Sequence, residues 1–136
     1  MEKKWFTPEE ANALLPQIQK ELTALQTIKR KFEEGYMRLR RMKEQAAAAG
    51  FRSEMPDPFF ELECELEFMQ IEARTLIQSI HMKGAQLKDL DLGLVDFPSV
   101  VNGEEVLLCW KQGEPKIAYY HGLYDGYGGR KPLKDA

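Results

Sequence analysis

The stretch LVDFPSVVNGEEVLLCWK, Leu94 to Lys111, decides the fold of the C-terminal third of the chain. It consists of two runs rich in Val, Leu and aromatic residues that flank Asn102-Gly103. This dipeptide is the strongest short hairpin signal, because a type I′ turn needs positive φ at both central residues. The turn fixes the register, and the expected cross-strand pairs are Val101 with Glu104, Ser99 with Val106, Phe97 with Leu108 and Val95 with Trp110.

A third strand is expected in KIAYYHGL, Lys116 to Leu123, after the loop QGEP. The proline of this loop has no backbone N–H to close a two-residue turn, so a four-residue loop is favoured. That loop sets Lys111 opposite Lys116. The sequence therefore predicts a three-stranded antiparallel meander over 94–123, followed by a Gly-rich tail over 124–136.

The run CWKQGEPKIAYYH, Cys109 to His121, holds a thiol, a carboxylate and an imidazole. Because side chains alternate across a strand, the expected register puts Cys109 and His121 on opposite faces of the sheet. Glu114 lies at the loop tip, about 23 Å along the strand from His121. We therefore expect these three residues to form no common site. One face of the sheet is expected to carry Phe97, Leu108, Trp110, Ile117, Tyr119 and His121.

Two long helices should precede the meander. In FTPEEANALLP, Thr7 is a suitable N-cap, Pro8 takes the first helical position and Glu10 can close a capping box. Apolar residues at heptad spacing then run to the turn AAAAGFRSEMPDP, and a second heptad pattern follows it. The sequence predicts an antiparallel, coiled-coil-like hairpin of helices over 8–49 and 57–84, and hence an α+β fold.

The helical pair carries more apolar surface than two helices can bury between them. The apolar residues off the heptad seam are Ile28, Met42, Phe60, Phe68, Ile71 and Ile77. A third layer or a second subunit should cover them, and we expect a homodimer with a four-helix seam. The chain of 136 residues is sized for a single domain, 1–136.

Composition argues against several classes of function. A formal net charge of −3 gives no overall attraction to nucleic acid. No apolar run reaches the roughly 20 residues of a membrane span, and the N-terminus lacks the apolar stretch of a secretory signal. The two cysteines, Cys64 and Cys109, offer neither a disulfide framework nor a metal knuckle. We expect a cytoplasmic protein with free thiols and no membrane partner. Nucleic-acid binding through the basic run Lys29 to Lys43 is a third hypothesis, which the interleaved Glu33 and Glu34 disfavour.

Candidate chemistry centres on His121, which the expected register places near Glu104 and Ser99. His121, Glu104 and a carboxylate such as Asp125 are candidate metal ligands. A Ser99 nucleophile would lack the sharp elbow and the oxyanion hole of such sites, and a half-buried histidine is the plain alternative. The segment KDLDLGLVD lacks the later glutamate of a calcium loop and is interpreted as a helix-to-strand connection.

The chain opens with FTPEEANALLP and later contains KDLDLGLVDFPS, EVLLCWKQGEP, IAYYH and GGRKPL. Together these motifs resemble a bacterial family catalogued as domain of unknown function 2203. The resemblance implies no established reaction, substrate or cofactor. It implies that residues on the recurring motifs are site candidates, namely Asp96, Trp110, Glu114, His121 and Arg130.

Two hypotheses from different classes follow. The first is a non-enzymatic dimeric scaffold or interaction module with a protein partner, because most of the pattern lies in heptads and caps. The alternative is a small-ligand- or metal-binding protein, with hydrolysis as one activity considered for it. Its ligand-binding residues would be His121, Glu104, Arg130, Trp110, Asp96 and Glu114. The sequence names no substrate or cofactor, and it leaves open whether the protein is an enzyme and whether the aromatic face is core or pocket.

Overall fold

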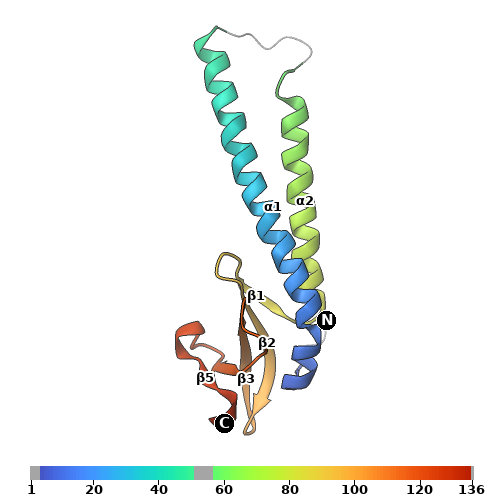
Figure 1. The fold of residues 1–136 in the computed structure, drawn as a ribbon, viewed down its shortest axis with the longest axis vertical. Helices are drawn as coiled ribbons and strands as arrows, with labels where there is room; N and C mark the ends of the chain where they lie inside the picture. Colours follow the sequence, from blue (N-terminus) through green and yellow to red (C-terminus); the bar gives the residue numbers. More distant parts are fainter. Residues whose placement is uncertain (1–3, 51–56, 136) are drawn as a thin grey trace.

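The fold is a helical hairpin standing on an antiparallel sheet (Figure 1). The computed structural model describes residues 4–50 and 57–135. Its helices are α1 (Pro8–Ala48), α2 (Phe60–Met82) and two 3-10 turns, η1 (Tyr127–Gly129) and η2 (Leu133–Asp135). Its strands are β1 (Gln86–Asp89), β2 (Leu94–Val101), β3 (Glu104–Lys111), β4 (Tyr119–Gly122) and β5 (Lys131–Pro132). The predicted combination of two helices and an antiparallel sheet is therefore confirmed.

The start of α1 is held by the predicted capping box. The Glu10 amide donates to Thr7 Oγ1 at 3.1 Å, and the Thr7 amide donates to Glu10 Oε1 at 2.9 Å. Pro8 takes the first helical position, where its missing N–H costs nothing. These reciprocal bonds satisfy backbone donors that would otherwise have no partner.

The start of α2 differs from the predicted boundary at 57. The Asp57 carboxylate accepts the Phe59 amide at 2.9 Å, but the residues after it form a turn and the helix begins at Phe60. Most of the predicted hairpin turn, 51–56, lies outside the described residues. Neither helix within the described ranges is long and apolar enough to cross a membrane.

The far half of the hairpin has its own small apolar cluster. Leu39 of α1 packs there against Leu62 and Leu66 of α2, and partly buried Phe32, Met42, Phe59 and Met69 surround them. Gly35 lets the helices approach closely, because a Cβ at this position would lie 2.8 Å from Leu66 Cδ2. This cluster is separate from the main core described below.

The sheet has five strands in the order β1-β2-β3-β4-β5, not the predicted three. Strand β1 overlaps the first two residues of the segment KDLDLGLVD, which was interpreted as a connection between helix and strand, and β5 lies in the predicted Gly-rich tail. Both are short, and β5 contains a proline, so neither shows the long alternation of apolar residues that marks a strand.

The register of the first predicted hairpin is confirmed. Val101 pairs with Glu104, and the pairing continues to Val95 with Trp110. Asn102 has φ 52° and Gly103 has φ 80°, the two positive values that a type I′ turn requires.

The register of the second hairpin is one residue away from the prediction. Cys109, rather than Leu108, pairs with Tyr119, and Leu107, rather than Val106, pairs with His121. A slip of one residue moves every side chain to the other face of the sheet. His121 and Tyr119 therefore lie on the face opposite to the one expected.

The register differs because backbone amides at both ends of the β3–β4 connection bind side chains instead of the neighbouring strand. The Lys111 amide donates to Glu114 Oε1 at 2.7 Å, and the Ile117 amide donates to Asn12 Oδ1 of α1 at 2.8 Å. Neither amide is free for the β3–β4 ladder, so pairing starts only at Tyr119. The connection is longer than the predicted four-residue loop.

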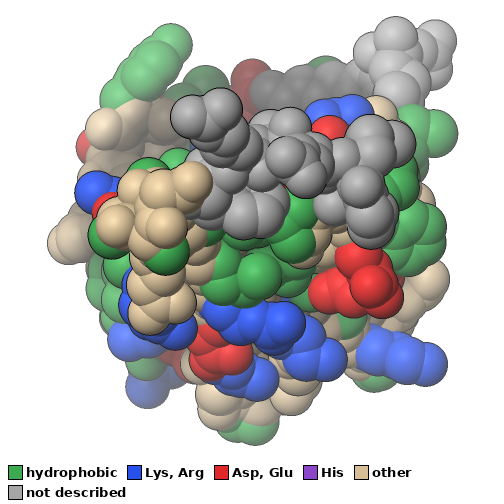
Figure 2. Space-filling view, turned by 90° about the horizontal axis from the view of Figure 1, so that it is seen from above, with side chains coloured by type: hydrophobic (Ala, Val, Ile, Leu, Met, Phe, Trp, Pro, Cys, Tyr) green, Lys and Arg blue, Asp and Glu red, His purple; other side chains and the backbone are tan. Residues whose placement is uncertain are grey.

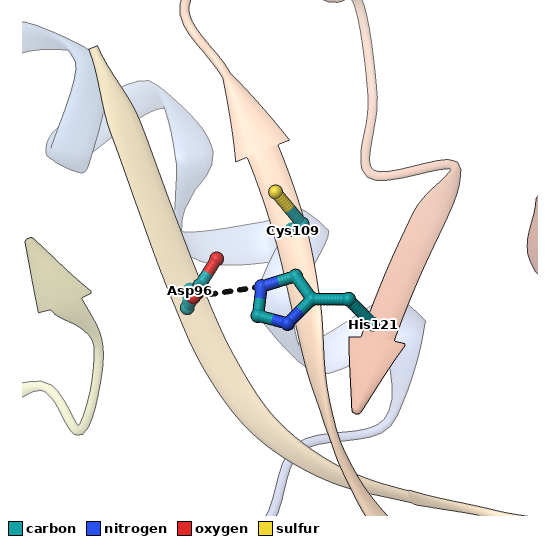
Figure 3. A group of neighbouring side chains, drawn as sticks. All are labelled: Asp96, Cys109 and His121. Atoms are coloured by element: carbon teal, nitrogen blue, oxygen red, sulfur yellow. Dashed lines mark hydrogen bonds and ion pairs between the residues drawn. The ribbon is translucent and has the colours of Figure 1, made fainter. Parts of the chain in front are cut away.

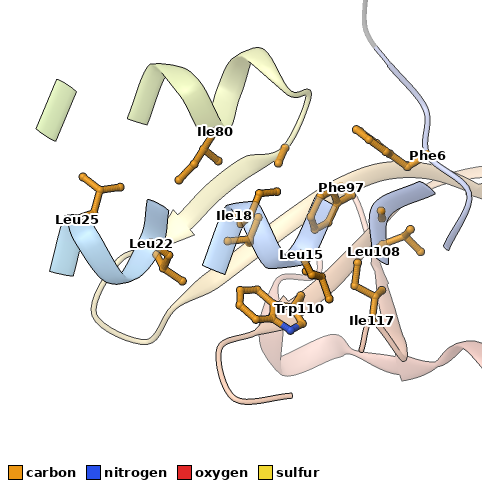
Figure 4. Packing of buried hydrophobic residues seen from close by; sticks show 13 residues of the cluster. Phe6, Leu15, Ile18, Leu22, Leu25, Ile80, Phe97, Leu108, Trp110 and Ile117 are labelled. Carbon is orange, nitrogen blue, oxygen red and sulfur yellow. The ribbon is translucent and has the colours of Figure 1, made fainter. Parts of the chain in front are cut away.

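One face of the sheet, here called the core face, is covered by the helices (Figure 4). Its buried side chains are Val95, Phe97, Leu108 and Trp110, which pack with Ile117 against Leu15, Ile18, Leu22, Leu25 and Ile80. Trp110 is fully buried among them, and its indole N–H donates to the Glu114 carbonyl at 3.0 Å. The aromatic face is therefore core, not the wall of a pocket.

The opposite face carries Asp96, Leu107, Cys109 and His121 and is here called the tail face. The segment after β4 turns back over this side of the sheet before it enters β5 (Figure 1). As a result, β2 is buried on both faces from Leu94 to Ser99.

Candidate functional site

Three neighbouring strands bring Asp96, Cys109 and His121 together on the tail face (Figure 3). Asp96 of β2 pairs with Cys109 of β3, and His121 of β4 lies on the same side beside them. One ligand atom from each residue lies within 4.8 Å of the other two. All three residues are buried, with exposures of 3%, 1% and 2%.

Two hydrogen bonds orient the imidazole of His121. Its Nδ1 lies 2.7 Å from the Gly122 carbonyl oxygen, and its Nε2 lies 2.9 Å from Asp96 Oδ2. A carbonyl only accepts, so Nδ1 carries a proton and donates it. In the neutral ring Nε2 is then an acceptor that faces a carboxylate, which is also an acceptor when ionised. The pair therefore requires a cation between its atoms, either a proton or a metal ion.

The Asp96 carboxyl sits in an environment that disfavours its charge. Burial raises its pKa, and the nearby His121, Cys109 and Lys88 offset part of this effect. A buried ionised carboxylate is stable only when a partner compensates the lost hydration. The histidine supplies that partner directly.

The Cys109 thiol is protonated at neutral pH. Burial raises its pKa to about 12, with the nearby Asp96 charge adding to the effect and Arg130 opposing it. A thiol with so high a pKa is a poor nucleophile by itself. A metal ion could still displace the proton and bind the thiolate, because coordinating thiols are deprotonated outright.

Arg130 is fixed by several partners at the edge of this cluster. Its Nη1 donates to both Glu114 carboxylate oxygens, at 3.0 and 3.1 Å. Its guanidinium lies 4.2 Å from the Tyr119 ring centre and 4.3 Å from that of Tyr127. Paired and stacked in this way, Arg130 ties the segment after β4 to the β3–β4 connection.

A pocket of about 240 Å³ opens beside the cluster. Asp96, Cys109 and His121 all line it. The rest of the lining comes from Lys88 of β1 and from apolar or aromatic side chains, including Leu94, Leu123, Tyr124 and Tyr127. The three polar side chains are therefore accessible from one small cavity.

The structure brings together some of the predicted site residues and separates others. Asp96 and His121 are in direct contact, and Arg130 and Glu114 form an ion pair nearby. Trp110 lies on the core face. Glu104 is exposed at the β2–β3 turn. It lies about 10 Å along β3 from Leu107, the residue that pairs with His121. Asp125 is exposed and accepts the Gly122 amide at 3.1 Å.

Ser99, considered as a nucleophile, is bound elsewhere. Its hydroxyl donates to the Phe6 carbonyl oxygen at 2.6 Å, so it anchors the segment before α1 to β2. Among the described residues, Ser99 forms no hydrogen bond with His121. Its role is therefore structural.

Sequence reasoning excluded Cys109 from the site and did not consider Lys88 as a site residue. The expected register set Cys109 opposite in face to His121, and a slip of one residue reverses that result. The confirmed first hairpin already pairs Asp96 with Cys109, which was the available signal for two of the three residues of the cluster. No comparable signal existed for Lys88, since β1 itself was not predicted.

The fold and the site together define a class of protein: an α+β chain in which a sheet of five strands carries a buried Asp–Cys–His cluster open to a small pocket. The chain belongs to the family described as uncharacterized conserved protein (DUF2203), whose sequence profile matches residues 4–133. A search of the curated proteins found no match, and neither did a search of the solved structures.

Proposed function

We propose that this protein binds one divalent transition-metal ion through Asp96, Cys109 and His121. The observation that carries the proposal is the contact between two acceptors, His121 Nε2 and Asp96 Oδ2, at 2.9 Å. A metal ion in place of the shared proton would satisfy both atoms. It would also leave the imidazole neutral, with Nδ1–H bound to a backbone carbonyl as in most histidine-ligated metal sites.

The donor set favours an ion of the zinc type. One nitrogen, one sulfur and one oxygen ligand suit borderline metals, whereas Mg²⁺ and Ca²⁺ prefer oxygen alone. The three atoms are close enough that small side-chain rotations would bring them to about 2.0–2.3 Å from one ion. Three protein ligands leave a fourth position, and the pocket that all three residues line would supply water or a small ligand to it.

The chain offers matched controls, because it has only two cysteines and two histidines. Calorimetric titration of the reduced protein with Zn²⁺ and with Co²⁺ should give one ion per chain. Cys109→Ala and His121→Ala should each weaken binding more than about 100-fold, since even outer-shell partners of a metal contribute 10–100-fold. Cys64→Ala and His81→Ala, at exposed positions on α2, should bind like the wild type.

Circular dichroism of each variant separates loss of a ligand from loss of the fold. Folded Cys109→Ala and His121→Ala variants that keep wild-type affinity would refute the metal site.

A second candidate function, a dimeric scaffold, is supported by a different surface. An exposed apolar stripe runs along α2 through Phe60, Phe68 and Ile71, with exposures of 64%, 62% and 55%. We propose a second copy of the chain as its occupant, because the charges are complementary. Acidic residues Glu61, Glu65 and Glu72 flank the stripe, and exposed Lys31, Arg38 and Arg41 lie on α1.

Seen from the end of the helical hairpin that lies farthest from the sheet, hydrophobic and basic side chains lie side by side (Figure 2). Sedimentation equilibrium should give a dimer that Phe68→Glu dissociates and that Val100→Glu, an exposed apolar position on β2, leaves intact. A wild-type monomer at micromolar concentration would refute this candidate.

We further infer one domain in a reducing, cytoplasmic setting. The main core joins α1, α2 and the sheet, which supports a single folding unit. Both cysteines are free, and a Cys109 metal ligand needs reduced thiols.

A further inference from the structure

The pocket beside the cluster combines one positive charge with apolar walls. We propose that it binds a small organic monocarboxylate with an apolar or aromatic body, whose carboxylate takes the open metal position and pairs with Lys88. This inference rests on the proposed metal site and adds the class of ligand that the site accepts.

An irregularity in β1 places Lys88. Gln86 pairs with Asp96 and Leu87 with Val95, but the register then shifts so that Asp89 pairs with Leu94. Lys88 is the extra residue at this shift. Bulges of this kind re-aim a side chain and are over-represented next to binding sites. Here the result is that Lys88 lines the pocket together with Leu94 and Asp96.

Lys88 is available for a ligand in a way that Arg130 is not. Arg130 is paired with Glu114, and its guanidinium contacts the rings of Tyr119 and Tyr127. The Lys88 side chain is exposed and forms no ion pair or hydrogen bond with other side chains or backbone groups of residues 4–50 and 57–135. Its positive charge favours the ionised form of the Asp96 carboxyl and so lowers the pKa of that group.

Charge balance selects an anion. A divalent ion held by one carboxylate, one thiolate and a neutral imidazole forms a site with no net charge. Lys88 then makes the pocket positive, since it is the one cationic side chain among the described residues that line it. A neutral or cationic ligand would form no ion pair with the ammonium group.

The walls and the volume select a small apolar body. Leu107, Leu123, Tyr124 and Tyr127 line the pocket with Leu94. Tyr124 is 98% exposed at the rim, where a bound ligand would cover part of its ring. A cavity of about 150 Å³ already accommodates benzene, so a pocket of about 240 Å³ fits a ligand of roughly ten non-hydrogen atoms. Inorganic phosphate would leave the apolar walls in contact with water.

The test uses the full chain loaded with Co²⁺, whose visible absorption changes when a ligand enters the metal's coordination shell. The probe is benzoate, and benzyl alcohol is the neutral probe of similar shape. Benzoate should shift the spectrum and bind at least tenfold more tightly than benzyl alcohol. Lys88→Gln should weaken benzoate at least tenfold and leave Co²⁺ uptake unchanged, whereas Lys20→Gln, at an exposed position on α1, should leave both unchanged.

The outcomes separate this inference from the proposed function. A protein that takes up no Co²⁺ at the cluster overturns the metal site and this inference with it. A protein that takes up Co²⁺ but binds benzoate no better than benzyl alcohol, or equally well after Lys88→Gln, overturns the inference alone. Binding of phosphate in preference to benzoate also overturns it, because the apolar walls would then contribute nothing.

Discussion

His121 Nε2 lies 2.9 Å from Asp96 Oδ2, while Nδ1 of the same ring is committed to the Gly122 carbonyl at 2.7 Å. Both ring nitrogens thus face oxygen acceptors inside a buried cluster. Without a metal, one proton must be shared by the pair, as imidazolium with carboxylate or as imidazole with carboxylic acid. The first prediction follows from this requirement.

Asp96→Asn should preserve the stability of the metal-free protein, because the amide can donate to Nε2 of a neutral imidazole. Asp96→Ala should lower the free energy of unfolding by about 1–3 kcal/mol, since it leaves a buried acceptor without a donor. Urea unfolding with chelator present measures both. Equal destabilisation by the two substitutions would show that the pair is held by charge and not by the shared proton.

The two thiols should differ in reactivity. Cys109 is 1% exposed and has a pKa of about 12, whereas Cys64 is exposed on α2. Because the thiolate is the reactive form, iodoacetamide at about pH 8 should modify Cys64 alone in the folded protein and both residues after denaturation. Peptide mass analysis gives the extent at each position. Comparable rates in the folded state would contradict the burial of Cys109.

Alkaline pH should destabilise the metal-free protein, measured with chelator present, partly through Cys109. Folding raises the pKa of this thiol from its ordinary 9.0 to about 12, so between these values the unfolded chain has lost a proton that the folded chain keeps. Stability therefore falls as pH rises through this window, by about 1.4 kcal/mol for each unit of pKa difference. Cys109→Ala should show a shallower loss when unfolding is measured from about pH 8 to pH 11. A parallel loss in both proteins would exclude this thiol as a cause.

Asn12 should hold the β3–β4 connection in place. Its Oδ1 accepts the Ile117 amide at 2.8 Å, and Ile117 is buried in the core. Asn12→Ala leaves that amide without its partner and should cost about 1–3 kcal/mol of unfolding free energy. Asn12→Asp keeps an acceptor oxygen and should cost less. Thermal unfolding compares the two, and an equal loss would show that the hydrogen bond is not the cause.

The same bond shows where sequence reasoning succeeded and where it could not. The capping box and the Asn102-Gly103 turn were predicted because each depends on residues within a few positions of one another. The β3–β4 register depends on Asn12 binding Ile117, residues separated by 105 positions. No pattern near the loop reports such a contact, so the length of the connection was misjudged.

The expected length of the β3–β4 connection determined which residues were expected beside His121. Asp96 and His121 were both named as candidates, yet the expected register put them on opposite faces and set His121 near Glu104 instead. The sequence predicts three strands instead of five because β1 and β5 are too short to show the alternation of apolar and polar residues that marks a strand. The family motifs named Asp96 and His121, the expected register excluded Cys109, and only the long-range pairing of β3 with β4 determines which of these residues meet.

The separation of the two apolar clusters has a consequence for how the molecule opens. The main core reaches along α1 only as far as Leu25, and the far cluster begins around Phe32 and Leu39. Proteins exchange amide hydrogens in cooperative units that follow such packing boundaries. The end of the hairpin should therefore unfold locally and refold many times while the strands around Asp96 stay folded. Ligands bound at the sheet would slow exchange in those strands and leave the hairpin end unprotected.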